Sequence, residues 1–122
     1  MLLKQLSEHF TVCKISDPSA VNWNAQFCFF SRTDEEFSLV CTTADTPSET
    51  VAREDGWRCF RVQGILDFSL TGILSRISGI LAENKIGIFA VSTYNTDYIF
   101  VKGTAFEKAM TVLKKAGYTI TD

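Results

Sequence analysis

The sequence predicts an α+β fold, and three observations lead to that prediction. Of the 122 residues, 46% are hydrophobic and 21% are charged, which is the balance of a chain that folds around a core. Residues 57–121 show the hydrophobic periods of strand, helix, strand, strand, helix and strand, in that order. Residues 1–56 show strand patterns with little helical signal, so we expect a strand-rich first half.

The first half is expected to consist of strands joined by turns. Its strands span residues 10–15, 27–33 and 37–42. The charged residues 34–36 form the tip of a hairpin, and residues 18–24 form a short turn that begins at a proline. Residues 42–56 indicate a linker. Because so short a segment buries little surface alone, we expect it to pack against the second half.

The second half begins with a strand and a helix. Residues 57–63 alternate in hydrophobicity, with Phe60 and Val62 on one face. Ser69 is the expected N-cap of the helix, and residues 84–87 are its stop. The apolar stripe of this helix comprises Leu70, Ile73, Leu74, Ile77, Ile80 and Leu81.

A hairpin, a second helix and a last strand complete the second half. The strands span residues 88–94, 97–102 and 118–121. Residues 95–96 make the hairpin turn. Thr104 and Glu107 have the spacing of a capping box at the start of the second helix, and Gly117 is its stop.

This order is the split βαβ arrangement of a ferredoxin-like βαββαβ domain. Right-handed crossovers place the strands at 57–63 and 97–102 side by side, with both helices on one face of the sheet. The first half echoes the start of this order, with its helix shortened. We therefore expect a degenerate, strand-rich unit at residues 1–56, packed with a ferredoxin-like unit at residues 57–122.

Charge and hydropathy argue against two classes of partner. The 12 basic and 14 acidic residues give a net charge of -2 without any block of like charge, so we expect no nucleic acid partner. The N-terminus lacks the apolar run of a signal peptide, and no uncharged apolar stretch of membrane-spanning length follows it. We expect a soluble cytoplasmic protein without a membrane partner.

The cysteines and the histidine do not have the spacing of a metal site. There is no C-x-x-C pair, and His9 is the single histidine. The cysteines are Cys13, Cys28, Cys41 and Cys59. Each lies in an apolar, strand-like run, so we expect buried or half-buried, unreactive thiols, no metal and no cofactor.

No catalytic constellation stands out in the sequence. There is no nucleophile elbow, no cysteine–histidine pair and no glycine-rich phosphate loop. Residues 62–69 resemble the phosphate-binding loop of acylphosphatases, but Ser69 stands where that family needs an arginine to hold the phosphoryl oxygens. We therefore expect that the protein is not an enzyme and has no catalytic residues.

Two loops carry polar groups that suit an amino acid. The N–H groups at the start of the first helix, near Ser69, attract a carboxylate. Asp67, Asn95 and Asp97 offer oxygens to an ammonium group. A free amino acid carries both of these charges. The same residues also fit a simple helix cap and a simple turn, and both interpretations stay open.

The sequence resembles ACT domains, which are small regulatory modules that bind amino acids between neighbouring copies. Residues 66–74 and 81–101 carry this resemblance. Residues 27–33, 36–41 and 56–58 resemble a subfamily of free-standing bacterial proteins with two ACT-like units. That subfamily is similar to the ACT units of the animal cytosolic arginine sensor. The resemblance covers nearly the whole chain.

The resemblance implies a ligand-binding cleft at an interface between ACT-like units. The residues that it places around the ligand are Ile65, Leu66, Asp67, Phe68, Ser69, Leu70, Ser92, Thr93, Tyr94, Asn95, Thr96 and Asp97. Asp97 is the implied partner of the ammonium group, and Phe68 and Tyr94 shape the side-chain pocket. The curtailed helix at residues 18–24 departs from the family, which argues against a second symmetric cleft.

The leading hypothesis is a regulatory protein in which a bound amino acid shifts assembly or the docking of a protein partner that the sequence does not identify. The resemblance also implies a homodimer. The alternative is a protein–protein interaction module without a ligand. Its surface would be the exposed sheet face formed by Ile88, Ala90, Tyr94, Tyr98 and Phe100.

Overall fold

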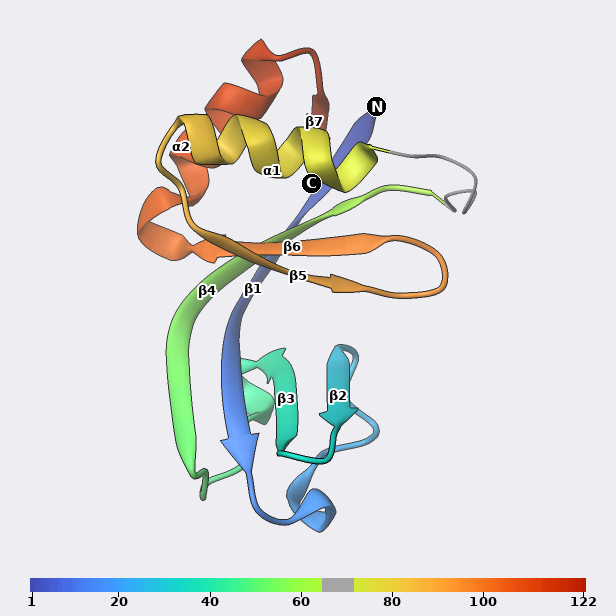
Figure 1. Ribbon diagram of the computed structural model, residues 1–122, viewed down its shortest axis with the longest axis vertical. Helices are drawn as coiled ribbons and strands as arrows, with labels where there is room; N and C mark the ends of the chain where they lie inside the picture. The colour runs from blue at the N-terminus through green and yellow to red at the C-terminus, as the bar shows by residue number, and fades with distance from the viewer. Residues whose placement is uncertain (65–71) are drawn as a thin grey trace. The chain divides into compact units, whose positions relative to one another are not determined.

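The computed structural model describes residues 1–64 and 72–122, in which the chain has a mixed α/β fold (Figure 1). This part of the chain contains seven strands and two α-helices. It divides into two compact units, one formed by residues 1–7 with 58–122 and the other by residues 8–57. Strands β1 (Leu2–Ile15) and β4 (Ala52–Val62) each contribute residues to both units.

The unit of residues 1–7 and 58–122 contains both helices. After β4 come α1 (Ile73–Glu83), β5 (Ile88–Ser92), β6 (Asp97–Lys102), α2 (Gly103–Lys115) and β7 (Thr119–Thr121). The strands lie in the order β5, β6, β4, β1, and β7 pairs with β1. The expected neighbours, β4 and β6, are therefore confirmed. Figure 1 shows α1 and α2 on the same side of the β5–β6 hairpin.

The core of this unit forms where the helices meet the sheet. The apolar stripe of α1 buries Ile77 and Leu81 completely, and Phe60 of β4 is equally buried. Each such side chain contributes about 1.5–3 kcal/mol of transfer free energy. The guanidinium of Arg58 lies 4.3 Å from the ring centroid of Phe106 on α2 and also donates to the Leu6 carbonyl at 2.9 Å. The helices thus pack on an apolar layer, and Arg58 adds a cation–π contact to α2.

The helix ends agree only in part with the sequence patterns. The N-cap of α1 is Gly72, at a φ of 77°, whereas the expected cap, Ser69, lies outside the described residues. The capping box of Thr104 and Glu107 is wrong, because the N-cap of α2 is Lys102 and makes no side-chain cap bond. Gly117 ends α2 as expected, with a left-handed φ of 107°.

The unit of residues 8–57 repeats the element order with its helices reduced. It contains β2 (Cys28–Arg32) and β3 (Phe37–Thr42), in the strand order β2, β3, β1, β4. Short 3-10 helices, η1 (Pro18–Ala20) and η2 (Thr43–Asp45), follow β1 and β3. The expected linker at residues 42–56 is corrected, because η2 and the first residues of β4 lie within it.

A smaller apolar cluster holds this second unit together. Its buried members are Cys13, Ile15, Val21, Leu39 and Cys41. Phe30 of β2 continues the cluster, with its ring stacked on Phe37 and its edge toward Trp23. The burial expected for the cysteines is confirmed, because Cys13, Cys41 and Cys59 are buried and Cys28 is half-buried.

Candidate functional site

Residues 92–97 connect β5 to β6 in a closed turn. The Thr93 N–H donates to the Thr96 carbonyl at 2.8 Å, and the Thr93 hydroxyl donates to the same oxygen at 3.0 Å. The Thr96 N–H in turn donates to the Thr93 hydroxyl at 3.3 Å. These bonds close the turn through the Thr93 hydroxyl, and threonine hydroxyls often bond to the nearby backbone in this way.

A buried hydroxyl ties this turn to β4. Thr96 is only 7% exposed, and its hydroxyl donates to the Val62 carbonyl at 2.7 Å. Val62 is the last residue of β4, three positions before the first predicted loop begins at residue 65. The turn is therefore anchored to the end of β4. No local pattern predicts this bond, because it joins residues 34 positions apart in the chain.

Ser92 and Asp97 form the polar pair at the base of the turn. They are opposite one another in the β5–β6 register, and the Ser92 hydroxyl donates to the Asp97 carboxylate at 2.6 Å. A hydroxyl bond of this length to a carboxylate orients the carboxylate and leaves its negative charge in place. Asp97 is half-buried, so a cationic ligand group has access to it.

The structure brings six of the predicted site residues together on one turn. These are Ser92, Thr93, Tyr94, Asn95, Thr96 and Asp97. Tyr94 is 80% exposed at the tip, and Asn95 beside it is also exposed. The other six predicted residues, Ile65 to Leu70, lie outside the described residues.

The alternative interaction surface does not lie on a single face. Ile88 is opposite Val101 in the register and packs against the core, whereas Phe89 is opposite Phe100, with the two rings stacked at 4.5 Å. Ala90 shares the face of Ile88, and Tyr98 shares the face of Phe100. The predicted set is therefore wrong, because the register between the two strands, and not the alternation along each one, decides which of their residues share a face.

The turn between β2 and β3 has the same hydrogen bonds. The Thr33 N–H donates to the Glu36 carbonyl at 3.0 Å, and the Glu36 N–H donates to the Thr33 hydroxyl at 3.2 Å. Here Arg32 and Phe37 occupy the two positions of the Ser92–Asp97 pair. The second turn therefore has the hydrogen bonds of the first but lacks an equivalent of the Ser92–Asp97 pair.

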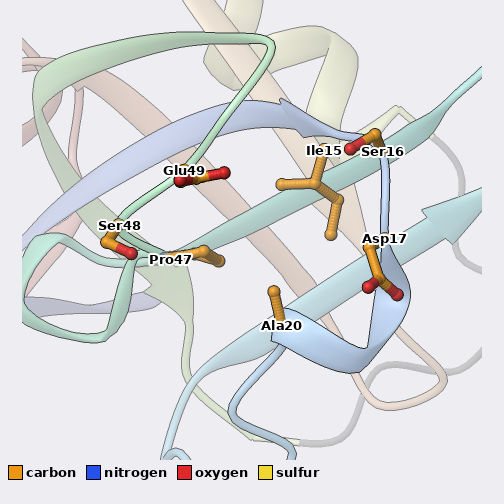
Figure 2. A pocket seen from close by; sticks show the side chains of 7 residues that line it. All are labelled: Ile15, Ser16, Asp17, Ala20, Pro47, Ser48 and Glu49. Carbon is orange, nitrogen blue, oxygen red and sulfur yellow. The ribbon is translucent and has the colours of Figure 1, made fainter.

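A hollow in the unit of residues 8–57 was not predicted from the sequence (Figure 2). It has a volume of about 420 Å³ and is lined by Ile15, Ser16, Asp17, Ala20, Pro47, Ser48 and Glu49. Asp17 accepts the Ser19 N–H at 3.0 Å, and this bond holds the pKa of its exposed carboxyl below the ordinary value. Figure 2 shows the carboxylates of Asp17 and Glu49 on separate segments around Ile15.

The described part of the chain holds neither a group of metal-binding side chains nor a membrane-spanning helix. Over residues 1–64 and 72–122, no three His, Cys, Asp or Glu side chains are grouped to hold a metal ion. In the same residues, no helix is both long and apolar enough to cross a membrane.

Comparison with known proteins gives similarity at the level of structure. No curated protein matches the sequence. The crystal structure of the protein Atu0741 from Agobacterium tumefaciens is 32% identical, with a TM-score of 0.86 over 98% of this chain and 90% of that one. The Vibrio cholerae protein VC0802, described as of unknown function and a possible transport protein, is 17% identical, with a TM-score of 0.71 over 91% and 85%.

The ligand-free regulatory subunit of aspartate kinase from Thermus thermophilus has the same fold at lower identity. It is 9% identical, with a TM-score of 0.64 over 94% of this chain and 96% of that one. The family model described as the ACT domain matches residues 52–115. That range runs from the first residue of β4 to the last residue of α2 and includes the turn at 92–97. Because the match spans more than half of the 122 residues, the chain belongs to the ACT domain family.

Proposed function

We propose that this protein is a regulatory amino-acid-binding protein rather than an enzyme. The ligand binds at an interface between ACT-like units and shifts assembly or the docking of a protein partner. The observation that carries the proposal is the Ser92–Asp97 pair, an oriented carboxylate on a rigid turn inside the ACT-matched range. Similarity in fold to a regulatory subunit of aspartate kinase supports a regulatory rather than a catalytic role.

The chemistry of the turn suits the ammonium end of an amino acid. Asp97 supplies the negative charge, and the Ser92 hydroxyl fixes its direction. The Thr96 anchor to Val62 holds the turn in place before any ligand arrives, so little ordering is needed on binding. The carboxylate end of the ligand is assigned to residues 65–70, with Phe68 and Tyr94 around its side chain.

The proposal includes a particular assembly. We assign two ACT-like units in a cytoplasmic homodimer. Their expected bounds are residues 1–56 and 57–122, and the second, ferredoxin-like unit also includes residues 1–7, which form one compact unit with residues 58–122. The recurrence of the element order in residues 8–57 and the shared turn of Thr33 and Thr93 support this assignment. If the cleft lies on a two-fold interface, both sides present a copy of the same turn. If it lies on any other interface, it joins two different surfaces.

One observation favours a second function, a protein–protein interaction module without a ligand. Tyr94 is a large side chain, 80% exposed at the tip of a rigid hairpin. Exposed tyrosines supply contact area in protein interfaces at a low entropy cost. In that case the turn at 92–97 binds a partner protein directly.

Thermal unfolding of the purified chain with each common amino acid tests the proposal. A ligand at a hundred times its Kd adds about 2.7 kcal/mol to the free energy of unfolding, which raises the Tm by several degrees. Asp97→Asn keeps an acceptor for Ser92 and removes the charge, so it should abolish the rise. Asp34→Asn, in the equivalent turn of the other hairpin, is the matched control and should keep it.

Each outcome distinguishes the two functions. A selective rise that Asp97→Asn removes and Asp34→Asn keeps supports amino-acid binding at this turn. No rise with any amino acid moves the assignment to the interaction module, and Tyr94→Ala then tests partner binding. A rise that survives Asp97→Asn would place the ligand elsewhere in the protein.

A further inference from the structure

We propose that Cys28 and Cys41 form a modification site at which a peroxide joins the two thiols in a reversible disulfide. Both thiols are free and lie in the unit of residues 8–57, far from the turn at 92–97 in sequence. Cys28 is the first residue of β2, and Cys41 lies near the end of β3. The two residues are directly opposite one another in the antiparallel register.

The hydrogen-bond pattern of the hairpin places the two side chains at close range. The Thr33 N–H donates to the Glu36 carbonyl, so this closing pair is hydrogen-bonded. Hydrogen-bonded and non-hydrogen-bonded pairs alternate along an antiparallel ladder. The register stays constant from the Thr33–Glu36 pair outward. The Phe29–Val40 pair is therefore hydrogen-bonded, and the next pair, Cys28–Cys41, is non-hydrogen-bonded.

A non-hydrogen-bonded pair has the geometry that a disulfide needs. Its Cα atoms lie about 4.5 Å apart, and disulfides span Cα separations of about 4.4–6.8 Å. The side chains of directly opposite residues also point to the same face of the sheet. Cys28 and Cys41 therefore need rotation about their side-chain bonds to join, with little change in the backbone.

The third thiol on this face provides an internal comparison. Cys41 is opposite Thr11 on β1, and Cys13 is opposite Leu39, so Cys13 is diagonal to Cys41. Diagonal neighbours lie about 7–8 Å apart, beyond the range of a relaxed disulfide. The register thus selects Cys28 rather than Cys13 as the partner of Cys41, although all three side chains belong to one cluster.

Exposure decides which sulfur meets the oxidant. Cys28 is half-buried on β2, which is the end strand of the sheet among the described residues. Cys41 is 2% exposed. Peroxide oxidises the Cys28 sulfur to a sulfenic acid and releases one water as its O–O bond breaks. The Cys41 sulfur then displaces the hydroxyl as a second water, so the two thiols together give up two electrons and two protons.

Peptide mapping of the full chain tests this assignment. The reduced protein is treated with hydrogen peroxide, its remaining thiols are blocked with iodoacetamide, and it is cleaved with trypsin. Because Lys14, Arg32 and Arg53 separate the cysteines, Cys13, Cys28 and Cys41 fall in peptides 5–14, 15–32 and 33–53. The expected product is the pair 15–32 with 33–53, lighter by two hydrogen atoms and lost on treatment with dithiothreitol.

Two variants sharpen the assignment. Cys28→Ser should abolish the crosslinked pair, and Cys13→Ser, the matched control on the same face, should leave it intact. A crosslink between peptides 5–14 and 33–53 in the unmodified chain would overturn the proposal. So would oxidation of Cys28 to the sulfinic acid with no crosslink at all. The mapping of the unmodified chain needs no variant, so a folding defect in a variant does not remove the test.

Discussion

The side chain of Thr96 is buried, and its hydroxyl donates a hydrogen bond to the Val62 carbonyl. Thr96→Val keeps the shape of the side chain and removes the donor, which leaves a buried acceptor without its 2.7 Å bond. We expect a loss of about 1–3 kcal/mol in the free energy of unfolding, measured by urea denaturation. Thr104→Val, at an exposed position on α2, is the control. Equal losses in the two variants would mean that the bond to Val62 does not contribute.

Asp17 gives a pH dependence whose sign follows from its bond to the Ser19 N–H. That bond lowers the pKa of the carboxyl in the folded protein. A lowered folded-state pKa contributes stability above the unfolded-state pKa, and the contribution disappears as pH falls through the folded-state pKa. NMR titration of the Asp17 carboxyl should therefore show a midpoint below that of an ordinary aspartate. A midpoint at the ordinary value would contradict this expectation.

The thiols of Cys28 and Cys41 should become more reactive as pH rises. Burial is the main cause that raises the pKa of both thiols, and the Asp45 carboxylate raises both further. For Cys41, the hydroxyl of Thr46 lowers the pKa, and the neighbouring Cys13 raises it. Because the thiolate is the reacting form, alkylation and peroxide oxidation should accelerate beyond the pH at which an exposed thiol reaches its plateau.

Asp45→Asn provides the test of that electrostatic contribution. It removes the charge and keeps one of the two oxygens that accept from Asn22 and Thr42, so the alkylation rate of Cys28 at fixed pH should increase. Cys59, which is fully buried in the other unit, is the internal reference. An unchanged Cys28 rate would mean that burial alone sets its pKa.

At the scale of elements, the start of α2 shows how a sequence motif can be present and unused. The chain passes from β6 directly into α2 at Gly103, so Thr104 already lies in the first turn instead of before it. Thr104→Ala should therefore change the free energy of unfolding by less than about 0.5 kcal/mol, whereas loss of a working cap costs about 1 kcal/mol. Urea denaturation distinguishes these values.

Elements with a clean period or a well-bounded apolar run could be predicted from the sequence, and elements without either could not. The bounds of β6 match the expected 97–102, because its continuous apolar run lies between clear turn signals. The first residues of β1 were missed, because its buried residues Leu3 and Leu6 are three positions apart, which breaks the period of two. The first residues of β4 were missed for a different reason, since residues 52–56 are all exposed and carry no apolar signal.

The candidate site could be predicted in the same partial way. The turn at 92–97 carries local signals, and its six residues are consecutive in the chain, so their proximity follows from the sequence, while their role in ligand binding stays a prediction. The bond from Thr96 to Val62 and the register of Cys28 with Cys41 join residues far apart in the chain. Such pairings depend on which strands are neighbours, and a single sequence does not encode that in its local pattern.

At the scale of the whole molecule, two spectroscopic probes report separately on the two units. Both tryptophans, Trp23 and Trp57, lie in residues 8–57, and both α-helices lie in the other unit. Because β1 and β4 run without interruption through both units, unfolding of either one frees strands of the other. Tryptophan fluorescence and far-UV circular dichroism should therefore give coincident urea transitions.

Separate transitions would show that the units unfold independently. The variant Ile77→Ala sharpens this test, because it removes a fully buried side chain from the helical unit and should cost about 2–5 kcal/mol. In a cooperative molecule, it should shift the fluorescence transition by the same urea concentration as the circular dichroism transition.

Because β7 pairs with β1, the unit of residues 1–7 and 58–122 cannot be transferred to another protein as one continuous segment. Leu2 and Leu3 lie beside Thr119 and Ile120 in parallel, and Leu3 is fully buried in the core that α1 and α2 cover. A segment cut at residue 57 would carry both helices and lose the strand that closes their sheet. A chimera that keeps the helical unit must therefore include residues 2–7 together with residues 58–121. An insertion within residues 8–57 should disturb this unit less than a cut of the chain between the two units.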